Sequence, residues 1–389
     1  MQWLWLLVAA RVADARFANR TVVVDRGAFP HLAIVGSDKG GTSDAFVAIV
    51  KHGDWAAKYT VDCDTIRVKK LGDRARDKCR QKSKELGCLY RGGTLESWRR
   101  CYSGYVPDNM KKGITDKLWM DATPNYLWGW CRGTDAASRL FELSPRTVVV
   151  ALLREPMDRL RSLFNYWSTE PIGLEIATTL EPHVLLDLAY LEKPWATPVT
   201  RTTASETLSA ERLFEEGGRD VYELYQKNYV IWAGGQPREV CAGVLGPKQR
   251  RGPWGRGEMR ERCPVFTNLI LTGLYYTFLR HWIRLFPEQV IVVQSEYYFQ
   301  DRRVLLSLLG RGAPAPAIDG PPASSHAKKV ANRGHYVYGN ATLTNETHAR
   351  LEAFYARPNA LLRTLLADEA RAGRILVSPD PAVPGSWWT

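Results

Sequence analysis

The chain has 389 residues, of which 45% are hydrophobic and 11% aromatic. It can therefore bury a sizeable core, which excludes a wholly disordered or collagen-like protein. Its 53 Lys and Arg residues outnumber its 41 Asp and Glu residues, so the formal charge of +12 favours an anionic partner. Seven cysteines without a CxxC pair are too sparse for a disulfide-framework miniprotein or a structural zinc module.

The N-terminus points to the secretory pathway. Residues 3–10 are apolar, and residues 13–15 fit a small-x-small cleavage pattern, but the run is too short to span a bilayer. We predict that residues 1–15 are a signal peptide or a truncated signal anchor; a wrongly assigned start is also compatible with the sequence. Three glycosylation sequons agree with a lumenal protein, beginning at Asn19, Asn340 and Asn345.

The cysteines can oxidise in such a compartment, and their odd number leaves at least one without an intramolecular partner. Cys241 and Cys263 flank a Gly- and Pro-rich basic segment, so a bridge between them would tie its ends together. The sequence does not indicate which of the other cysteines form bridges with one another.

Apolar strands alternate with helical patterns along the chain. The predicted order is a strand at 31–35, a helix at 42–52, a strand at 147–153, a helix at 157–167, a helix at 268–286 and a strand at 290–294. This alternation predicts an α/β fold with a central parallel sheet flanked by helices. We expect one domain over residues 30–370 and a loosely ordered tail at 371–389.

In such sheets ligands bind beyond the carboxyl ends of the strands. The first of these loops is glycine-rich and reads Gly36, Ser37, Asp38, Lys39, Gly40, Gly41, Thr42, Ser43. Its backbone amides can turn toward an anion, and the helix that follows adds its positive end. The loop is therefore a candidate phosphate site, although an ordinary glycine-rich turn would look similar.

The loop differs from that of a nucleoside-triphosphatase. Gly36 and Gly41 have the spacing of the G-x-x-x-x-G-K-[ST] motif, but Thr42 replaces its lysine, and the lysine of this chain is Lys39 inside the turn. No carboxylate that could hold magnesium is evident after the later strands. These differences argue against an ATP or GTP phosphotransferase.

A second candidate phosphate site follows the second strand. Arg154 ends that strand and Ser162 comes eight residues later, which would place a guanidinium and a hydroxyl near one another. Two phosphate sites on one sheet indicate a nucleotide with two separate phosphate groups.

These two motifs resemble those of the carbohydrate sulfotransferases that use 3′-phosphoadenosine 5′-phosphosulfate (PAPS). Residues 34–46 look like the loop of that P-loop-like fold that binds the 5′-phosphosulfate, and residues 148–167 look like its Arg…Ser motif for the 3′-phosphate. The resemblance extends from about Leu32 to Leu366. Among subfamilies, the N-acetylgalactosamine 4-sulfate 6-O-sulfotransferase group is the most similar.

The resemblance also implies roles for individual residues. Asp121, in a segment similar to the family's acidic-x-Thr/Ser-Pro motif, would be the base for the acceptor hydroxyl. Heparan-type enzymes commonly have Glu-Lys where this chain has Asp121 and Ala122, and a cap or turn before Pro124 is the alternative role of Asp121. The donor would be bound by Lys39, Gly40, Gly41, Thr42, Ser43, Arg154 and Ser162, with a closing loop that contributes Lys329, Asn332 and Arg333.

The resemblance therefore implies a PAPS-dependent O-sulfotransferase, requiring no metal, that modifies an acidic polysaccharide of the chondroitin or dermatan type in the Golgi lumen or after secretion. Two basic segments, 67–84 and 248–262, would line the polymer groove, although each is also compatible with a solvated surface. We expect no nucleic acid partner and no membrane contact beyond an N-terminal anchor. The alternatives are a cytosolic-type sulfotransferase for small molecules and a non-enzymatic polyanion-binding lectin.

Overall fold

The computed structural model describes most of the predicted strands and helices. The described residues are 30–51, 55–56, 84–90, 93–105, 118–128, 135–169, 268–310, 342–383 and 385–388, together with short helical pieces at 180–181, 184–185 and 188. They fall into two compact units. The first comprises Met1–Leu153, Trp282–Arg333 and Leu366–Trp387, and the second comprises Arg154–His281, Gly334–Leu365 and Trp388–Thr389. Residues 30–370, predicted as one domain, are divided between both.

The first unit contains a six-stranded sheet, in which every pair of neighbouring strands is parallel. Its strands are β1 (Leu32–Gly36), β2 (Trp55–Ala56), β3 (Leu118–Asp121), β4 (Val148–Leu153), β5 (Val290–Gln294) and β6 (Ile375–Ser378). Their spatial order is β2-β3-β1-β4-β5-β6. After β1, the chain therefore forms β2 and β3 on one side of β1 and then β4, β5 and β6 on its other side. The carboxyl end of β1 is consequently the point at which ligands bind in open sheets of this kind.

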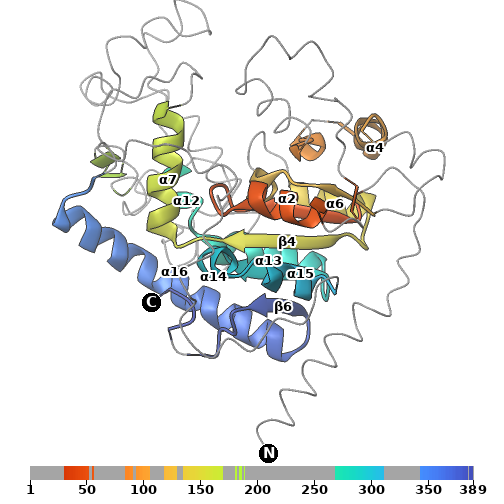
Figure 1. Ribbon diagram of the computed structural model, residues 1–389. Helices are drawn as coiled ribbons and strands as arrows, with labels where there is room; N and C mark the ends of the chain where they lie inside the picture. Colours follow the sequence, from red (N-terminus) through yellow and green to blue (C-terminus); the bar gives the residue numbers. More distant parts are fainter. Residues whose placement is uncertain are drawn as a thin grey trace, which may run out of the picture. The chain divides into compact units, whose positions relative to one another are not determined.

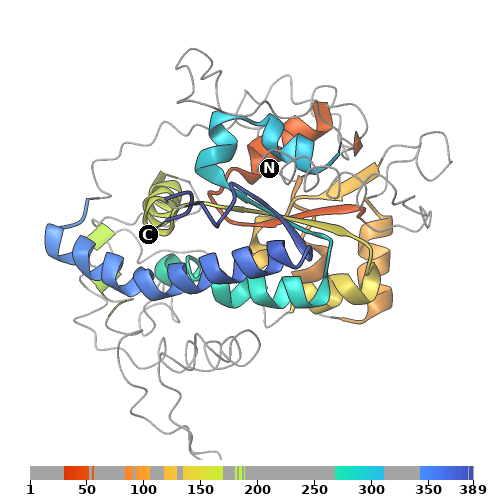
Figure 2. The same ribbon diagram turned by 90° about the horizontal axis from the view of Figure 1, so that it is seen from below.

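Helices cover both faces of this sheet (Figures 1 and 2). On one face, α2 (Thr42–Lys51), α14 (Ser295–Gln300) and α15 (Arg303–Leu308) pack on a buried apolar cluster that includes Leu32, Val150 and Ile291. On the other face lies α6 (Ala136–Leu143), whose Phe141 packs edge-on against Phe286. Strands β1 and β5 are buried throughout and, apart from Gln294 at the end of β5, they are apolar, as is typical of strands covered on both faces. The predicted α/β fold with a central parallel sheet and flanking helices is confirmed.

Two further segments of the first unit lie beyond the carboxyl end of β3. They consist of the short helix η2 (Cys88–Tyr90), followed by α4 (Leu95–Ser103), and of η3 (Pro124–Leu127), which comes directly after β3. A disulfide joins Cys88 of η2 to Cys101 of α4. The predicted bridge between Cys241 and Cys263 lies outside the described residues.

The second unit contains α7 (Pro156–Thr169) and α12 (Asn268–Leu271), which contact one another. Two other helices, α13 (Tyr275–Leu285) and α16 (Asn345–Arg371), contribute residues to both units. Within the second unit, the Tyr355 hydroxyl of α16 donates a hydrogen bond of 2.8 Å to the carbonyl of Ile270. No helix in the described part of the chain is long and apolar enough to cross a membrane.

The C-terminal segment differs from the prediction. Residues 371–389 were expected to be loosely ordered, but Ile375–Ser378 forms β6 and pairs with β5, with Val290 opposite Ile375. The Trp387 side chain is buried, and its indole nitrogen donates to the carbonyl of Pro379 at 2.9 Å. By pairing with β5, this strand provides hydrogen-bond partners for backbone groups along the outer edge of β5, which explains why the short apolar run is ordered.

Candidate functional site

The turn between β1 and α2 lies at the carboxyl end of the central strand, where the sequence predicted an anion site. Ser37 donates two hydrogen bonds to the carbonyl of Leu152 in β4, from its backbone nitrogen at 2.6 Å and from its hydroxyl at 3.0 Å. The backbone nitrogen of Gly40 then closes the turn onto the carbonyl of Ser37 at 2.9 Å. The turn is thus attached to the neighbouring strand by both the backbone and the side chain of Ser37.

Gly40 has no space for a side chain. A Cβ atom at this position would meet the carbonyl oxygen of Leu152 and would lie 2.7 Å from the Ser37 hydroxyl. From the other side, the Ser295 hydroxyl donates to the carbonyl of Gly40 at 2.7 Å. Only glycine fits here, because the turn packs directly on β4.

Lys39 occupies the left-handed region of backbone space, with a φ of 64°. This conformation costs a residue other than glycine about 1–2 kcal/mol. Such residues are concentrated at ligand sites, where the surrounding structure holds them in place. The Lys39 side chain is half-buried in the turn that the sequence predicted to bind a phosphosulfate.

The helix that follows the turn is anchored at its first charged residue. Asp44 accepts two hydrogen bonds from the guanidinium of Arg302, at 2.6 and 3.0 Å, and one from the Tyr298 hydroxyl at 2.8 Å. Burial raises the pKa of Tyr298 and the adjacent Asp44 carboxylate raises it further, which keeps the phenol a donor. Thus α2 is fixed to α14, and its amino end, with Thr42 and Ser43, has a defined position.

A second lysine reaches this helix end from a distant part of the sequence. Lys84 donates to the Ser43 hydroxyl at 2.8 Å and to the Thr42 hydroxyl at 3.4 Å, and its side chain is 5% exposed. Its own carbonyl accepts a hydrogen bond of 3.1 Å from the backbone nitrogen of Ala122, just after β3. The sequence showed Lys84 only as the last residue of a basic run, and no spacing rule connects it with residues 42 and 43.

Glu85 accompanies this lysine. One of its carboxylate oxygens lies 2.9 Å from the Lys84 ammonium, and its side chain is 42% exposed. The structure therefore places a carboxylate that solvent can reach beside the amino end of α2. Sequence reasoning did not select Glu85, because no motif recognised in the chain included it.

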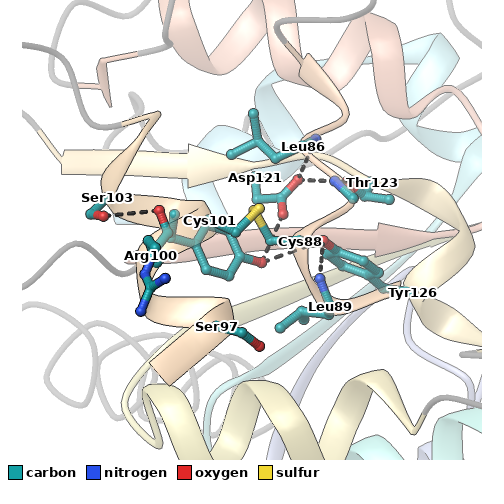
Figure 3. The surroundings of a disulfide bond; sticks show 12 residues. Leu86, Cys88, Leu89, Ser97, Arg100, Cys101, Ser103, Asp121, Thr123 and Tyr126 are labelled. Carbon is teal, nitrogen blue, oxygen red and sulfur yellow. Dashed lines mark hydrogen bonds between the residues drawn. A yellow bond between two sulfur atoms is a disulfide. The ribbon is translucent and has the colours of Figure 1, made fainter. Parts of the chain in front are cut away.

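Asp121 has a different environment (Figure 3). It is completely buried, and it accepts hydrogen bonds from the Thr123 hydroxyl at 2.7 Å, the Leu86 backbone nitrogen at 3.4 Å and the Tyr102 hydroxyl at 2.9 Å. Burial raises its pKa to about 6, while the hydrogen bonds from Thr123 and Tyr102 oppose this rise.

This environment bears on the role predicted for Asp121 as a base, which stays a prediction. A base must come within hydrogen-bond reach of the acceptor hydroxyl, but both oxygens of Asp121 accept hydrogen bonds within the protein and its side chain is completely buried. Its contacts instead join the end of β3 to Leu86 and to Tyr102 of α4. The structure therefore favours a structural role, close to the cap or turn alternative.

The second predicted motif belongs to the second unit and directly follows β4 in the chain. The carbonyl of Arg154 accepts a hydrogen bond of 2.8 Å from the Tyr275 hydroxyl, and the Glu155 carboxylate caps α7 by accepting from the backbone nitrogen of Asp158 at 2.6 Å. Ser162 lies within α7, and both Arg154 and Ser162 are half-buried. The predicted helix that carries the serine is confirmed, and the phosphate-binding role of both residues stays a prediction.

Other predicted site residues lie outside the described residues. These are Lys329, Asn332 and Arg333, the loop at 248–262 and the basic segment at 67–84 except for Lys84. Within the described ranges, no group of three or more His, Cys, Asp or Glu side chains is arranged to hold a metal ion.

Comparisons with known proteins add one observation. No protein-family model matches the chain, and a search of curated proteins finds no match. A sulfotransferase from Alicyclobacillus acidocaldarius is similar in structure, with 17% sequence identity over 86% of this chain and 95% of that chain, and with a TM-score of 0.37. A likeness at this level carries no argument about activity, so the functional argument depends on the residues themselves.

Proposed function

We propose that the protein is a PAPS-dependent O-sulfotransferase that acts on an anionic polysaccharide. The observation that carries this proposal is the glycine-rich turn that holds Lys39 at the carboxyl end of the central strand. Next to it, the Lys84 ammonium donates hydrogen bonds to the hydroxyls of Thr42 and Ser43. Backbone amides, hydroxyls and ammonium groups together suit an anion such as a phosphosulfate. The resemblance of residues 34–46 and 148–167 to the carbohydrate sulfotransferases supports the choice of PAPS.

Sulfuryl transfer is a displacement in which the protein mainly positions the reactants and stabilises charge. The acceptor hydroxyl oxygen attacks sulfur, and the bond between sulfur and the bridging oxygen of the 5′-phosphate breaks. The hydroxyl proton passes to a carboxylate, and adenosine 3′,5′-bisphosphate leaves with the electron pair of the broken bond. In this proposal Lys39 neutralises the charge that develops on the bridging oxygen, and the amide of Gly41 holds the 5′-phosphate. The Gly40 amide, which the resemblance also implied, already donates to the carbonyl of Ser37.

We assign the role of base to Glu85 in place of Asp121. The Glu85 carboxylate is partly exposed and pairs with Lys84, which contacts the helix end that would hold the donor. The Glu85 side chain is 42% exposed, whereas Asp121 is completely buried. The geometric requirement for a general base therefore favours Glu85.

The remaining donor contacts come from the resemblance. Arg154 and Ser162 would bind the 3′-phosphate, and Lys329, Asn332 and Arg333 would belong to a loop that closes over the nucleotide. The formal charge of +12 and the basic segments at 67–84 and 248–262 support an acidic polymer as acceptor. A chondroitin- or dermatan-like polymer in the Golgi lumen, as in the N-acetylgalactosamine 4-sulfate 6-O-sulfotransferase group, is the specific acceptor and location that we propose.

The test is transfer of labelled sulfate from PAPS to a panel of chondroitin sulfates, dermatan, heparan, neutral galactans and small phenols. We expect wild-type protein to sulfate an acidic polymer. We expect Lys39→Ala to lower turnover by about a hundredfold or more, because it removes the charge that stabilises the leaving group. Arg303→Gln serves as the matched control, since it removes one cation from an exposed ion pair with Asp301 on the same unit.

Several results would contradict the proposal. Near-normal turnover in Lys39→Ala would remove Lys39 from the mechanism. Sulfation of phenols but of no polymer would indicate a small-molecule sulfotransferase, and magnesium-dependent ATP hydrolysis would indicate a phosphotransferase. Binding of acidic polymers without any binding of the nucleotide would indicate a lectin.

A further inference from the structure

The ammonium group of Lys84 has an unusual position. It is almost completely buried at the amino end of α2, where the first backbone N–H groups of a helix carry partial positive charge. A cation is unfavourable at this end of a helix, whereas an anion is favourable. The fold nevertheless directs a lysine there from 41 residues away in the sequence.

Among the described residues, the partners of Lys84 compensate its charge only in part. Two of them, the hydroxyls of Thr42 and Ser43, are neutral, and the third, the Glu85 carboxylate, is 42% exposed to solvent. Burying an ammonium group is costly unless it is fully paired. An anion at the amino end of α2 would supply the missing negative charge, and it would contact both hydroxyls and the ammonium at once.

We propose that Lys84 is a second cation of the donor site, which binds the 5′-phosphate directly together with Thr42 and Ser43. This inference rests on the proposed function and adds a residue to it. The phosphosulfate group of the donor carries two negative charges, one on the phosphate and one on the sulfate. Lys39 meets one of them at the bridging oxygen, and Lys84 meets the other from the first turn of α2.

The position of Lys84 also compensates for the lysine that the glycine-rich loop lacks at position 42. A nucleoside-triphosphate loop has a lysine where this chain has Thr42. Here the Lys84 ammonium lies 3.4 Å from the Thr42 hydroxyl, so a cation reaches the same turn from a separate segment. Because the hydrogen bond to Ala122 fixes the backbone of Lys84 beside β3, the cation is positioned before the donor arrives.

The test compares two substitutions by their affinity for adenosine 3′,5′-bisphosphate, measured by calorimetry on the full chain. Lys84→Gln keeps a hydrogen-bond donor for Ser43 but removes the charge, whereas Lys84→Arg keeps both. We expect Lys84→Gln to weaken binding by about tenfold or more, since it removes one charge-assisted contact. We expect Lys84→Arg to restore most of the affinity, and Arg303→Gln to bind like wild type.

The outcomes separate this inference from the proposed function. If wild-type protein does not bind the nucleotide, the proposed function fails and the role of Lys84 fails with it. If wild type binds but Lys84→Gln binds equally well, Lys84 is a structural residue and only the further inference is overturned. Thermal unfolding of each variant checks the fold, and equal loss of affinity in Lys84→Gln and Lys84→Arg would also overturn the role of the charge.

Discussion

The turn between β1 and α2 and the segment that contacts it are held in place by different kinds of interaction. The turn is fixed mainly through backbone atoms, by the hydrogen bond from the Ser37 nitrogen to β4 and the close packing of Gly40, and the hydroxyls of Ser37 and Ser295 add to this. The contacting segment, described at residues 84–90 and 93–102, is fixed mainly by side chains. A disulfide joins Cys88 to Cys101, and the buried Asp121 accepts hydrogen bonds from both Leu86 and Tyr102.

This difference has consequences for how each part responds to its surroundings. Backbone hydrogen bonds in the turn do not titrate and cannot be reduced, so we expect the conformation of the turn to depend less on pH and redox conditions. The segment with Lys84 and Glu85 depends on one disulfide and on one carboxylate with a raised pKa. We therefore expect a substitution that adds bulk to disrupt the turn. We expect reduction of the disulfide or a change of pH to disrupt the contacting segment.

The largest effect on stability is expected from Gly40→Ala. The added Cβ would collide with the carbonyl of Leu152, and backbone atoms cannot move aside as a flexible side chain can. We expect a loss of more than about 3 kcal/mol in the free energy of unfolding, measured by urea denaturation. Gly310→Ala is the contrasting control, since a φ of 65° at Gly310 is unfavourable for alanine but nothing lies within 4 Å. Equal losses in both variants would show that packing on β4 is unimportant.

A somewhat smaller effect is expected from Cys101→Ser, which opens the bridge to Cys88. The bridge closes a short loop, with a sequence separation of 13, so its removal is expected to cost about 3 kcal/mol. Urea denaturation with and without a reductant measures this cost. Reduced wild type should match the variant, and Gly40→Ala should respond to the reductant as much as wild type does. If the reductant has no effect on wild type, the bridge does not hold the segment.

Much of the turn could be predicted from the sequence because its determinants are local. The apolar run at 31–35, the glycines after it and the helical spacing from Thr42 lie side by side in the chain, and each has a fixed structural meaning. The structure confirms strand, turn and helix there. The strand at 290–294 was predicted for the same reason and is also confirmed.

The segment that contacts the turn could not be predicted, because its determinants are distant in sequence. Pairing of Cys88 with Cys101 is one of many connectivities that seven cysteines allow. Lys84 reaches Ser43 only because parallel strands bring both to one edge of the sheet. Asp121 was selected by a local motif, but its burial depends on Tyr102 and Leu86, which the motif does not contain.

The smallest effect is expected from Asp121→Asn, and it depends on pH. Burial raises the Asp121 pKa from 3.8 to about 6, so the folded protein binds a proton more readily than the unfolded chain does. The contribution of Asp121 to stability is therefore present at low pH and is lost as the pH rises through about 6. Because asparagine does not titrate, the stability of wild type relative to Asp121→Asn should fall by about 2 kcal/mol between about pH 4 and pH 7. Urea denaturation of both proteins at each pH measures this difference. A constant difference across the range would mean that the Asp121 carboxyl is not desolvated, and the segment would then be as insensitive to pH as the turn.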